Sequence, residues 1–370
     1  MIEQRLKRLR EQTAAAELDV LAVVPGPNMH YLTGLSFHLS ERPAIAFFPA
    51  EGQPVLLVPA LEENKAKGAP FECRIFMYDD VSGPATAFAE SLTILGLAGK
   101  TLGVEGRRMR FLELDLMQGR TSSPAQIVNA DPVFAQLRMR KDKAEIEDMR
   151  RAVAIAQQAL EATLPALRPG VTETAIASEL MLQLFRAGSD PELPFAPLVA
   201  SGPNGANPHG FPSQRALEPG DLVTLDWGAT ANGYFSDITR TYAISGAPVA
   251  PELSQAYVAV QAANEAGRSM ARPGLTGQDV DRATRNVIDA AGLGHYFIHR
   301  TGHGLGLETH EEPDMKEGDL LPLEPGMTFT VEPGVYLPGL GGIRIEDAVV
   351  ITETGAESLT SLPRELITLA

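Results

Sequence analysis

Two aspartates, Asp226 and Asp237, lie in the segment DWGATANGYFSDITRT, which is otherwise apolar, aromatic or turn-forming. The Asn-Gly pair at 232–233 is a strong signal for a two-residue hairpin loop. A loop at 231–232 places the aspartates directly opposite each other, and a loop at 232–233 makes them diagonal neighbours. Because strand side chains alternate between faces, both registers put the two carboxylates on one face. Burying like charges this close together is costly unless a cation compensates them.

Three further residues could bind such a cation. His303 lies in the glycine-rich segment HRTGHGLGLETHEEP, Glu332 ends the β-like run MTFTVE, and Glu346 lies in IRIED. The segment PGVYLPGLGG separates the two glutamates, which predicts that they lie on neighbouring strands. Four carboxylates carry more negative charge than one divalent ion needs, but they suit two ions that share bridging carboxylates. Taken alone, the two aspartates are equally typical of turn and N-cap positions, and the three other residues favour the metal site.

Two other motifs are excluded by single positions. The pair His310-Glu311 resembles the start of the zinc motif HExxH, but position 314 is Asp, so that motif is absent. The glycines of GHGLGLE resemble a phosphate-binding loop, but no Lys-Ser/Thr pair follows at the required spacing. Nucleotide binding is therefore not expected.

The first third of the chain alternates short apolar runs with helical patterns. Strands are predicted at 18–24, 44–50, 54–60 and 101–105, and a helix at 85–97. This alternation is typical of an α/β domain. A charged helix is predicted over 138–164, with the crossing between two domains at 138–143. We place the boundary near residue 135, which gives domains of residues 1–135 and 136–370.

The pattern of predicted secondary structure changes after residue 195. Short β-runs such as LVTLDWGA, MTFTVEPGVYL and IRIEDAVVIT are separated by Gly, Pro and Asn. Helices are predicted at 173–187, 251–271 and 276–291, where apolar residues recur at helical spacing. The second domain is therefore expected to be α+β with a curved, mostly antiparallel sheet.

Composition limits the partners and the location. The formal net charge of -16 argues against nucleic acid and anionic membranes as partners. Hydrophobic residues make up 44% of the chain, yet no apolar run is long enough to span a membrane. The single cysteine, Cys73, allows no disulfide framework, and the charged N-terminal segment does not look like a signal peptide. We therefore expect a cytoplasmic protein.

The motifs DWGATANGYFSDITRT, HRTGHGLGLETHEEP, TVEPGVY and IRIED, in this order and spacing, resemble the "pita-bread" metallopeptidases. That group includes methionine aminopeptidases, aminopeptidase P, prolidase and the metal-free creatinases. The resemblance covers the chain from about residue 145 to the end. YLTGLS and the α/β pattern look, more weakly, like the creatinase-type, ribonuclease-H-like N-terminal domain. That domain, together with HRTGHG and NPHG, points to the Xaa-Pro peptidase branch.

The resemblance implies a role for each matching residue. Asp226 would chelate one of two divalent ions, Asp237 and Glu346 would bridge both, and His303 and Glu332 would bind the other. Glu332 would also carry the proton between the attacking water and the leaving amine. The substrate-binding positions that match the family are His209 in NPHG, His299, and His310, which could orient the carbonyl with His209. Arg344, also a substrate-binding candidate, matches a position that supports the bridging carboxylate.

Two substrate preferences stay open at this point. An Xaa-Pro dipeptidase must recognise the proline carboxylate, whereas an Xaa-Pro aminopeptidase must leave space beyond it. Prolidases and their relatives often carry Arg or a bulky residue just after HExP, but this sequence has Asp314 there. Arg42, in FHLSERPAIAF, is the alternative carboxylate anchor, and otherwise it is a surface arginine. We favour the dipeptidase.

The remaining expectations follow from the resemblance and from the ligand set. A metal-free creatinase-like enzyme or a non-catalytic peptide-binding pseudo-enzyme would lack ligands that are all present here. Oxygen and nitrogen ligands suit Mn, Co, Fe or Zn, and we favour Mn. The family resemblance also suggests a homodimer.

Overall fold

The computed structural model describes residues 2–118 and 122–369. The chain divides into two compact units, Met1–Arg138 and Met139–Ala370, each with its own set of sheets. Among the described residues, no helix combines the length and the apolar character that crossing a bilayer requires.

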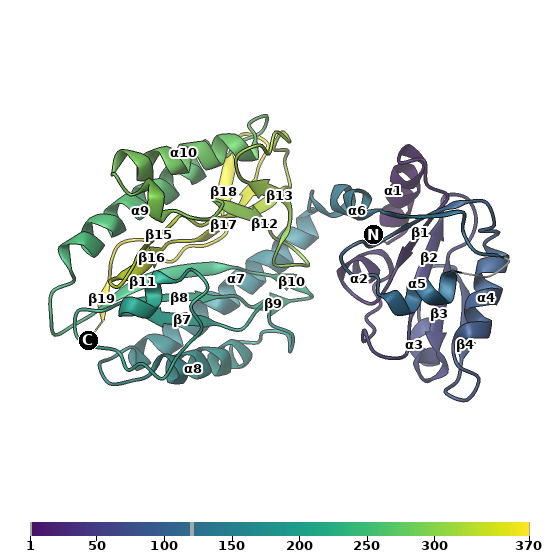
Figure 1. The fold of residues 1–370 in the computed structure, drawn as a ribbon, viewed down its shortest axis with the longest axis horizontal. Helices are drawn as coiled ribbons and strands as arrows, with labels where there is room; N and C mark the ends of the chain where they lie inside the picture. Colours follow the sequence, from purple (N-terminus) through teal and green to yellow (C-terminus); the bar gives the residue numbers. More distant parts are fainter. Residues whose placement is uncertain (1, 119–121, 370) are drawn as a thin grey trace. The chain divides into compact units, whose positions relative to one another are not determined.

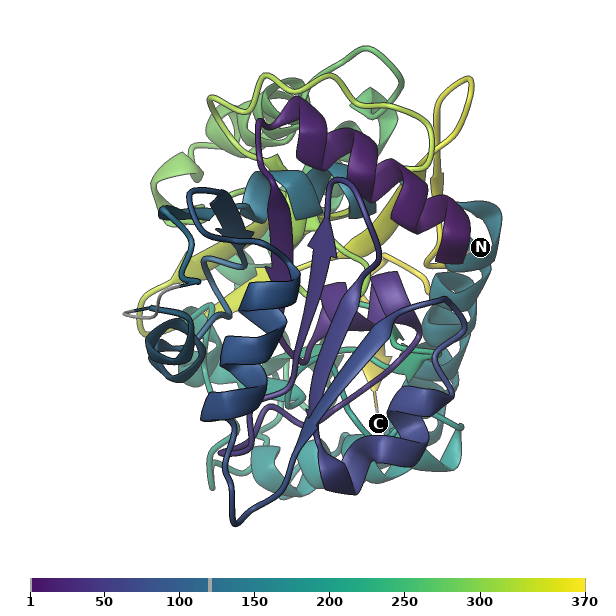
Figure 2. The same cartoon turned by 90° about the vertical axis from the view of Figure 1, so that its right-hand side faces the viewer.

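The N-terminal unit is an α/β domain built on one mixed sheet. Six strands form the sheet in the order β4-β3-β2-β1-β5-β6. Figure 2, which brings this unit to the front, shows the purple-to-blue strands side by side. The strands are β1 (Val20–Val23), β2 (Ile45–Pro49), β3 (Val55–Pro59), β4 (Arg74–Tyr78), β5 (Thr101–Val104) and β6 (Gln126–Asn129). The helices are α1 (Ile2–Ala15), α2 (Pro27–Thr33), α3 (Glu63–Lys67), α4 (Ala85–Ile94), α5 (Phe111–Met117) and α6 (Asp131–Arg138).

The sheet of this unit is buried along its central strands. Every residue of β1, β2 and β3 is buried, as expected for strands whose two faces are both covered. One core cluster joins these strands to Phe88 and Leu92 of α4 and to Leu116 and Met117 of α5. The predicted α/β alternation is confirmed, since each predicted strand and the helix near residue 85 are present.

The C-terminal unit is α+β, with antiparallel pairing throughout except for one short parallel pair, β11 with β19. Figure 1 shows α9 and α10 on one side of its strands and α7 and α8 on the other. The helices are α7 (Lys143–Thr163), α8 (Glu173–Arg186), α9 (Pro251–Met270) and α10 (Gly277–Ala290). The strands are β7 (Leu198–Ser201), β8 (Leu222–Trp227), β9 (Thr230–Ala231), β10 (Tyr234–Phe235), β11 (Ile238–Ile244), β12 (Gly302–Gly304), β13 (Glu311–Met315), β14 (Thr328–Val331), β15 (Gly334–Leu337), β16 (Gly341–Arg344), β17 (Asp347–Ile351), β18 (Ala356–Ser358) and β19 (Thr368–Leu369).

One helix begins later than its sequence predicts. The helix expected from residue 138 starts at Lys143, because Asp142 caps it. The Asp142 side chain accepts hydrogen bonds from the amides of Ala144 and Glu145, and the Glu145 carboxylate accepts one from the Asp142 amide. This capping box fixes the first helical residue. Residues 139–142 are instead outside any helix, and Arg140 forms an isolated bridge to Met327.

A long hairpin crosses the C-terminal unit in one register. Val331 of β14 pairs with Asp347 of β17, and Gly334 of β15 pairs with Arg344 of β16. The same register places Glu332 opposite Glu346, in the gap between the two ladders. The prediction that these glutamates lie on neighbouring strands is therefore confirmed.

Candidate metal centre

The Asn-Gly turn takes the second of the two predicted registers. Asn232 has φ 51° and Gly233 has φ 81°, the left-handed pair that a tight two-residue hairpin requires. Tyr234 therefore pairs with Ala231, and further along the strands Asp226 pairs with Thr239. The two aspartates are diagonal neighbours, not direct partners.

An isolated β-bridge links this hairpin directly to the long hairpin that carries the glutamates. Thr239 forms an isolated bridge with Glu346, and the Glu346 amide donates to the Thr239 carbonyl over 3.1 Å. The Thr239 hydroxyl also donates to the Glu346 carboxylate over 2.6 Å. Thr239 and Glu346, which are 107 positions apart in the chain, thereby lie side by side.

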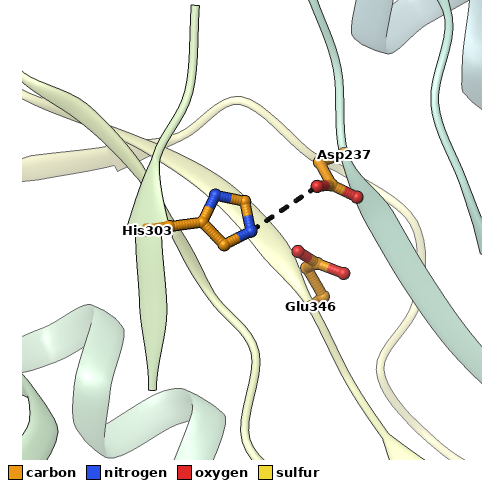
Figure 3. A group of neighbouring side chains, drawn as sticks. All are labelled: Asp237, His303 and Glu346. Carbon is orange, nitrogen blue, oxygen red and sulfur yellow. Dashed lines mark ion pairs between the residues drawn. The ribbon is translucent and has the colours of Figure 1, made fainter. Parts of the chain in front are cut away.

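His303 faces the carboxylates from β12. Figure 3 shows its ring directed at Asp237, with Glu346 beside them, and the three side chains offer ligand atoms within 4.8 Å of one another. His303 Nε2 lies 3.7 Å from an oxygen of Asp237 and 3.2 Å from one of Glu332. Its Nδ1 is 3.1 Å from the Gly304 carbonyl, the contact that turns Nε2 toward a metal in many histidine sites.

The titratable side chains of the site are buried or largely buried. Burial, together with the neighbouring carboxylates, raises the pKa of Asp237 and of Glu346 well above the usual range. Burial also raises the pKa of Asp226, an effect that the charge of Arg344 partly offsets. Burial opposes the ionisation of Glu332 as well, but the hydrogen bond and charge of His303 outweigh it and lower that pKa to about 2.

These residues fit a cation. The Asp226 Oδ1 atom is buried and has no hydrogen-bond partner among the residues that the structure describes, although its other oxygen pairs with Arg344. A buried carboxylate oxygen without a donor is costly, and a metal ion would satisfy it. The donor set, four carboxylates and one imidazole, is the hard oxygen-rich type that divalent ions such as Mn²⁺ accept. The sequence-predicted ligands thus lie together, and which ion each binds stays a prediction.

Arg344 is buried beside this cluster and connects four groups around it. Its guanidinium donates to the Asp226 carboxylate, the Thr239 hydroxyl, the Tyr336 hydroxyl and the Pro208 carbonyl. Tyr336 in turn lies 3.0 Å from His299 Nε2. The resemblance had placed Arg344 as support for a bridging carboxylate, whereas its direct carboxylate partner here is Asp226.

Tyr336 and Thr239 were not singled out from the sequence. Tyr336 packs across glycines: a Cβ at Gly334 would lie 2.4 Å from its hydroxyl, and one at Gly342 would lie 2.9 Å from its ring. Gly334 and Gly342 are therefore needed to admit the ring. That pattern, an aromatic residue flanked by glycines in paired strands, is the signal that could have identified Tyr336.

The three predicted histidines have different environments. His310 is exposed at one side and stacks edge-on against His303 with ring centroids 4.2 Å apart; the partial burial of its ring, with the charges of His303 and Arg300, lowers its pKa to about 4. Burial also lowers the pKa of His299, which is held by the Arg300 carbonyl and by Tyr336. His209 is exposed, and its amide donates to the Asn207 side chain.

Glu173 holds the loop that carries His209. Its carboxylate is fully buried and accepts five hydrogen bonds, from the amides and hydroxyls of Ser201 and Ser213 and from the Asn204 side chain. Both ends of the loop 201–213 are thereby tied to the start of α8. Arg344 ties its middle, through the Pro208 carbonyl. In the sequence, this role is visible only as an acidic residue in the first turn of a predicted helix.

Arg42 is the candidate that belongs to the N-terminal unit. Its Nε and Nη2 atoms donate to the two oxygens of Asp80, and Nη1 donates to Glu41. The guanidinium is partly exposed, and these acidic partners, led by Asp80 as the acceptor of its hydrogen bonds, raise its pKa. An anchoring role would require it to exchange one of these carboxylates for that of a substrate.

Comparisons with known proteins agree with this architecture. The model of metallopeptidase family M24 matches residues 147–353, and that of the creatinase/prolidase N-terminal domain matches residues 5–140. A probable dipeptidase PepE of Mycobacterium tuberculosis is 39% identical over 98% of this chain and 96% of its own. An Xaa-Pro dipeptidase of Lactobacillus delbrueckii subsp. lactis is 32% identical over 98% of both chains. The crystal structure of a prolidase from Thermococcus sibiricus superposes with a TM-score of 0.92 at 33% identity, covering 100% of this chain and 99% of that one.

The predicted fold classes, a creatinase-like N-terminal domain and a pita-bread C-terminal domain, are confirmed by these matches. The family also implies a peptidase that uses divalent metal ions. The chain belongs to metallopeptidase family M24, in the branch that carries the creatinase/prolidase N-terminal domain.

Proposed function

We propose that the chain is an Xaa-Pro dipeptidase with two divalent ions, Mn²⁺ by preference, in each subunit. The observation that supports the metal site most directly is the buried Asp226 Oδ1 atom, which has no hydrogen-bond partner among the described residues. It lies at the edge of a cluster of four carboxylates and His303. A protein without a cation there would keep like charges buried at high cost. In the proposed assignment Asp226 would hold one ion, His303 and Glu332 would hold the other, and Asp237 and Glu346 would be shared between them.

The ions, when bound, would supply a nucleophile from water at neutral pH and polarise the scissile carbonyl. Glu332 is suited to carry the proton, because its carboxylate lies within the cluster beside His303 and can accept a proton and give it up again. It would take a proton from the attacking water and give it to the proline nitrogen as the peptide bond breaks. His310 is neutral at pH 7, so its N–H can donate to the oxygen of the carbonyl without adding a charge.

Three other groups would position the substrate. The free amine of the substrate would lie beside Asp226, whose position Arg344 fixes. His209 and His299 would contact the peptide, since Arg344 links the His209 loop to Tyr336 and so to His299. Xaa-Pro bonds have no N–H to satisfy, so histidines and apolar groups can accept the proline ring without leaving a donor unpaired.

The comparisons favour a dipeptidase over an aminopeptidase, because relatives that align over almost the whole chain are named dipeptidase, Xaa-Pro dipeptidase and prolidase. Recognition of a dipeptide needs a cation for the proline carboxylate. We propose Arg42 for this task, released from Asp80 on binding. We further propose that the protein is cytoplasmic and that it forms a homodimer. Sedimentation equilibrium would test the dimer.

The direct test is hydrolysis by chelator-treated protein reloaded with Mn²⁺. We expect cleavage of Met-Pro and Ala-Pro, little turnover of Ala-Pro-Ala, and no activity before the metal is returned. Faster cleavage of Ala-Pro-Ala would make the protein an Xaa-Pro aminopeptidase. Mn²⁺ binding without hydrolysis of any of the three would refute the peptidase assignment and favour a peptide-binding role.

A further inference from the structure

Asn264 is a buried amide in the middle of helix α9. The rest of the buried face of this helix is small or apolar, with Ala256, Val260, Ala263 and Gly267 as its nearest members. The exposed fraction of Asn264 is 0%. A buried amide in such a place costs free energy unless its polar atoms are all bonded, which raises the question of what it holds.

Its partners are two main-chain carbonyls next to proposed metal ligands. Asn264 Nδ2 donates to the carbonyl of Val331 over 3.0 Å and to that of Ile345 over 3.3 Å. Val331 directly precedes Glu332, and Ile345 directly precedes Glu346. One amide group therefore joins the two chain segments that carry both glutamates.

The bond to Ile345 replaces one that the hairpin cannot make. The register that pairs Gly334 with Arg344 places Pro333 opposite Ile345, and the Ile345 amide does donate to the Pro333 carbonyl. Proline has no N–H to return to the Ile345 carbonyl. Asn264 supplies that donor from outside the sheet, at the point where the ladder between the two strands is interrupted.

The orientation of the amide is fixed by an arginine one helical turn away. Arg268 Nε donates to Asn264 Oδ1 over 2.8 Å, and the same nitrogen lies 3.5 Å from Asp347. Since a guanidinium only donates, Arg268 can bond only the oxygen of the amide, and the NH₂ group must face the two carbonyls. The arrangement leaves Asn264 no second stable orientation.

We propose that Asn264 is a positioning residue that sets the spacing of Glu332 and Glu346, and so the affinity for the two ions that these glutamates would share. The inference rests on the metal site assigned under Proposed function. The hydrogen bonds of the Asn264 side chain go to two main-chain carbonyls and to Arg268. Its effect passes through the main chain of the residues next to the glutamates.

The test is Mn²⁺ binding by two Asn264 variants. Asn264→Asp keeps the shape but loses both donors, and Asn264→Ala removes the side chain in case the new charge prevents folding. Titration calorimetry on chelator-treated protein should show two ions in the wild type. Because loss of a group that orients metal ligands typically costs 10–100-fold in affinity, we expect at least one ion to bind roughly tenfold or more weakly in both variants. The electron paramagnetic resonance signal of a coupled Mn²⁺ pair should also change.

Asn28→Ala is the matched control. Asn28 is also a nearly buried asparagine, bonded to Glu105 and Arg138 in the N-terminal unit, so its loss lowers stability without touching the glutamate segments. Its Mn²⁺ affinities should equal those of the wild type. If the Asn264 variants lose thermal stability but bind both ions with wild-type affinity and signal, the positioning role is refuted. If the wild type itself binds no Mn²⁺, the proposed metal site fails, and this inference fails with it.

Discussion

Replacing Glu173 by glutamine tests how the substrate loop is held. The substitution keeps the size of the side chain but turns one of its two acceptor oxygens into a donor. In the structure, one oxygen accepts from the amide and hydroxyl of Ser201, and the other accepts from Ser213 and Asn204. Whichever oxygen is replaced, at least one main-chain N–H then faces another donor, although the serine hydroxyls can turn and accept.

The expected cost follows from these bonds. An unpaired buried N–H costs about 1–3 kcal/mol, and each surviving bond loses about 1 kcal/mol when its acceptor becomes neutral. Removing the buried charge offsets part of this sum, because a neutral amide is less costly to desolvate. We therefore expect Glu173→Gln to lower the free energy of unfolding by about 2–4 kcal/mol, within the 5–15 kcal/mol typical of a folded domain.

Urea denaturation at a fixed Mn²⁺ concentration measures this change. Trp227 is the only tryptophan in the sequence and is fully buried in β8, so its fluorescence reports on the C-terminal unit. Glu179→Gln is the control, because it makes the same chemical change on the same helix, where one side-chain bond to Gln183 is at stake. We also expect kcat/KM for Ala-Pro to fall roughly tenfold, about 1.4 kcal/mol, as the His209 loop loosens. A loss of less than about 1 kcal/mol in stability would refute the reasoning.

Three further predictions concern charge. Metal-free Asp237→Asn should be more stable to urea than the metal-free wild type, and the difference should grow as pH rises from about 4. The pKa of Asp237 is raised in the folded wild type, so raising the pH forces a buried carboxyl to lose its proton and destabilises the fold. A difference that shrinks as pH rises would contradict this. Arg344→Met and its conservative partner Arg344→Lys should both lower kcat/KM for Ala-Pro more than 100-fold, about 2.7 kcal/mol. Methionine removes the donors altogether, and the single ammonium of lysine cannot reach the four partners of the guanidinium. Arg42→Ala should raise KM for Ala-Pro roughly tenfold and leave KM for Ala-Pro-Ala unchanged, since only the dipeptide has a free carboxylate on its proline. Equal effects on both peptides would show that Arg42 does not anchor the proline carboxylate.

The sequence specified the ligand cluster because its signals are local. Asn232-Gly233 dictates a tight turn, and the alternation of side chains then carries Asp226 and Asp237 to one face. The choice between the two registers was left open by the sequence analysis, since either Ala231 or Gly233 can be the loop residue beside Asn232. The start of α7 was misplaced for the opposite reason: the charged run at 138–143 has good helix formers, but the capping box of Asp142 and Glu145 overrides propensity.

What the sequence did not reveal is how the site is held, and the helices show a common answer. Glu173 of α8, Asn264 of α9 and Asp281 of α10 are all buried at positions where an amphipathic helix would carry an apolar residue. Each bonds to a segment that carries predicted site residues: Glu173 to the His209 loop, Asn264 to the two glutamate segments, and Asp281 to the amide and hydroxyl of Thr301, between His299 and His303. Four carboxylates can be kept at short range only if their strands cannot move apart, and strand ends have no ladder to hold them. A polar residue on the core face of a helix, read together with a catalytic motif elsewhere, is therefore the pattern that would predict such supports in a related sequence.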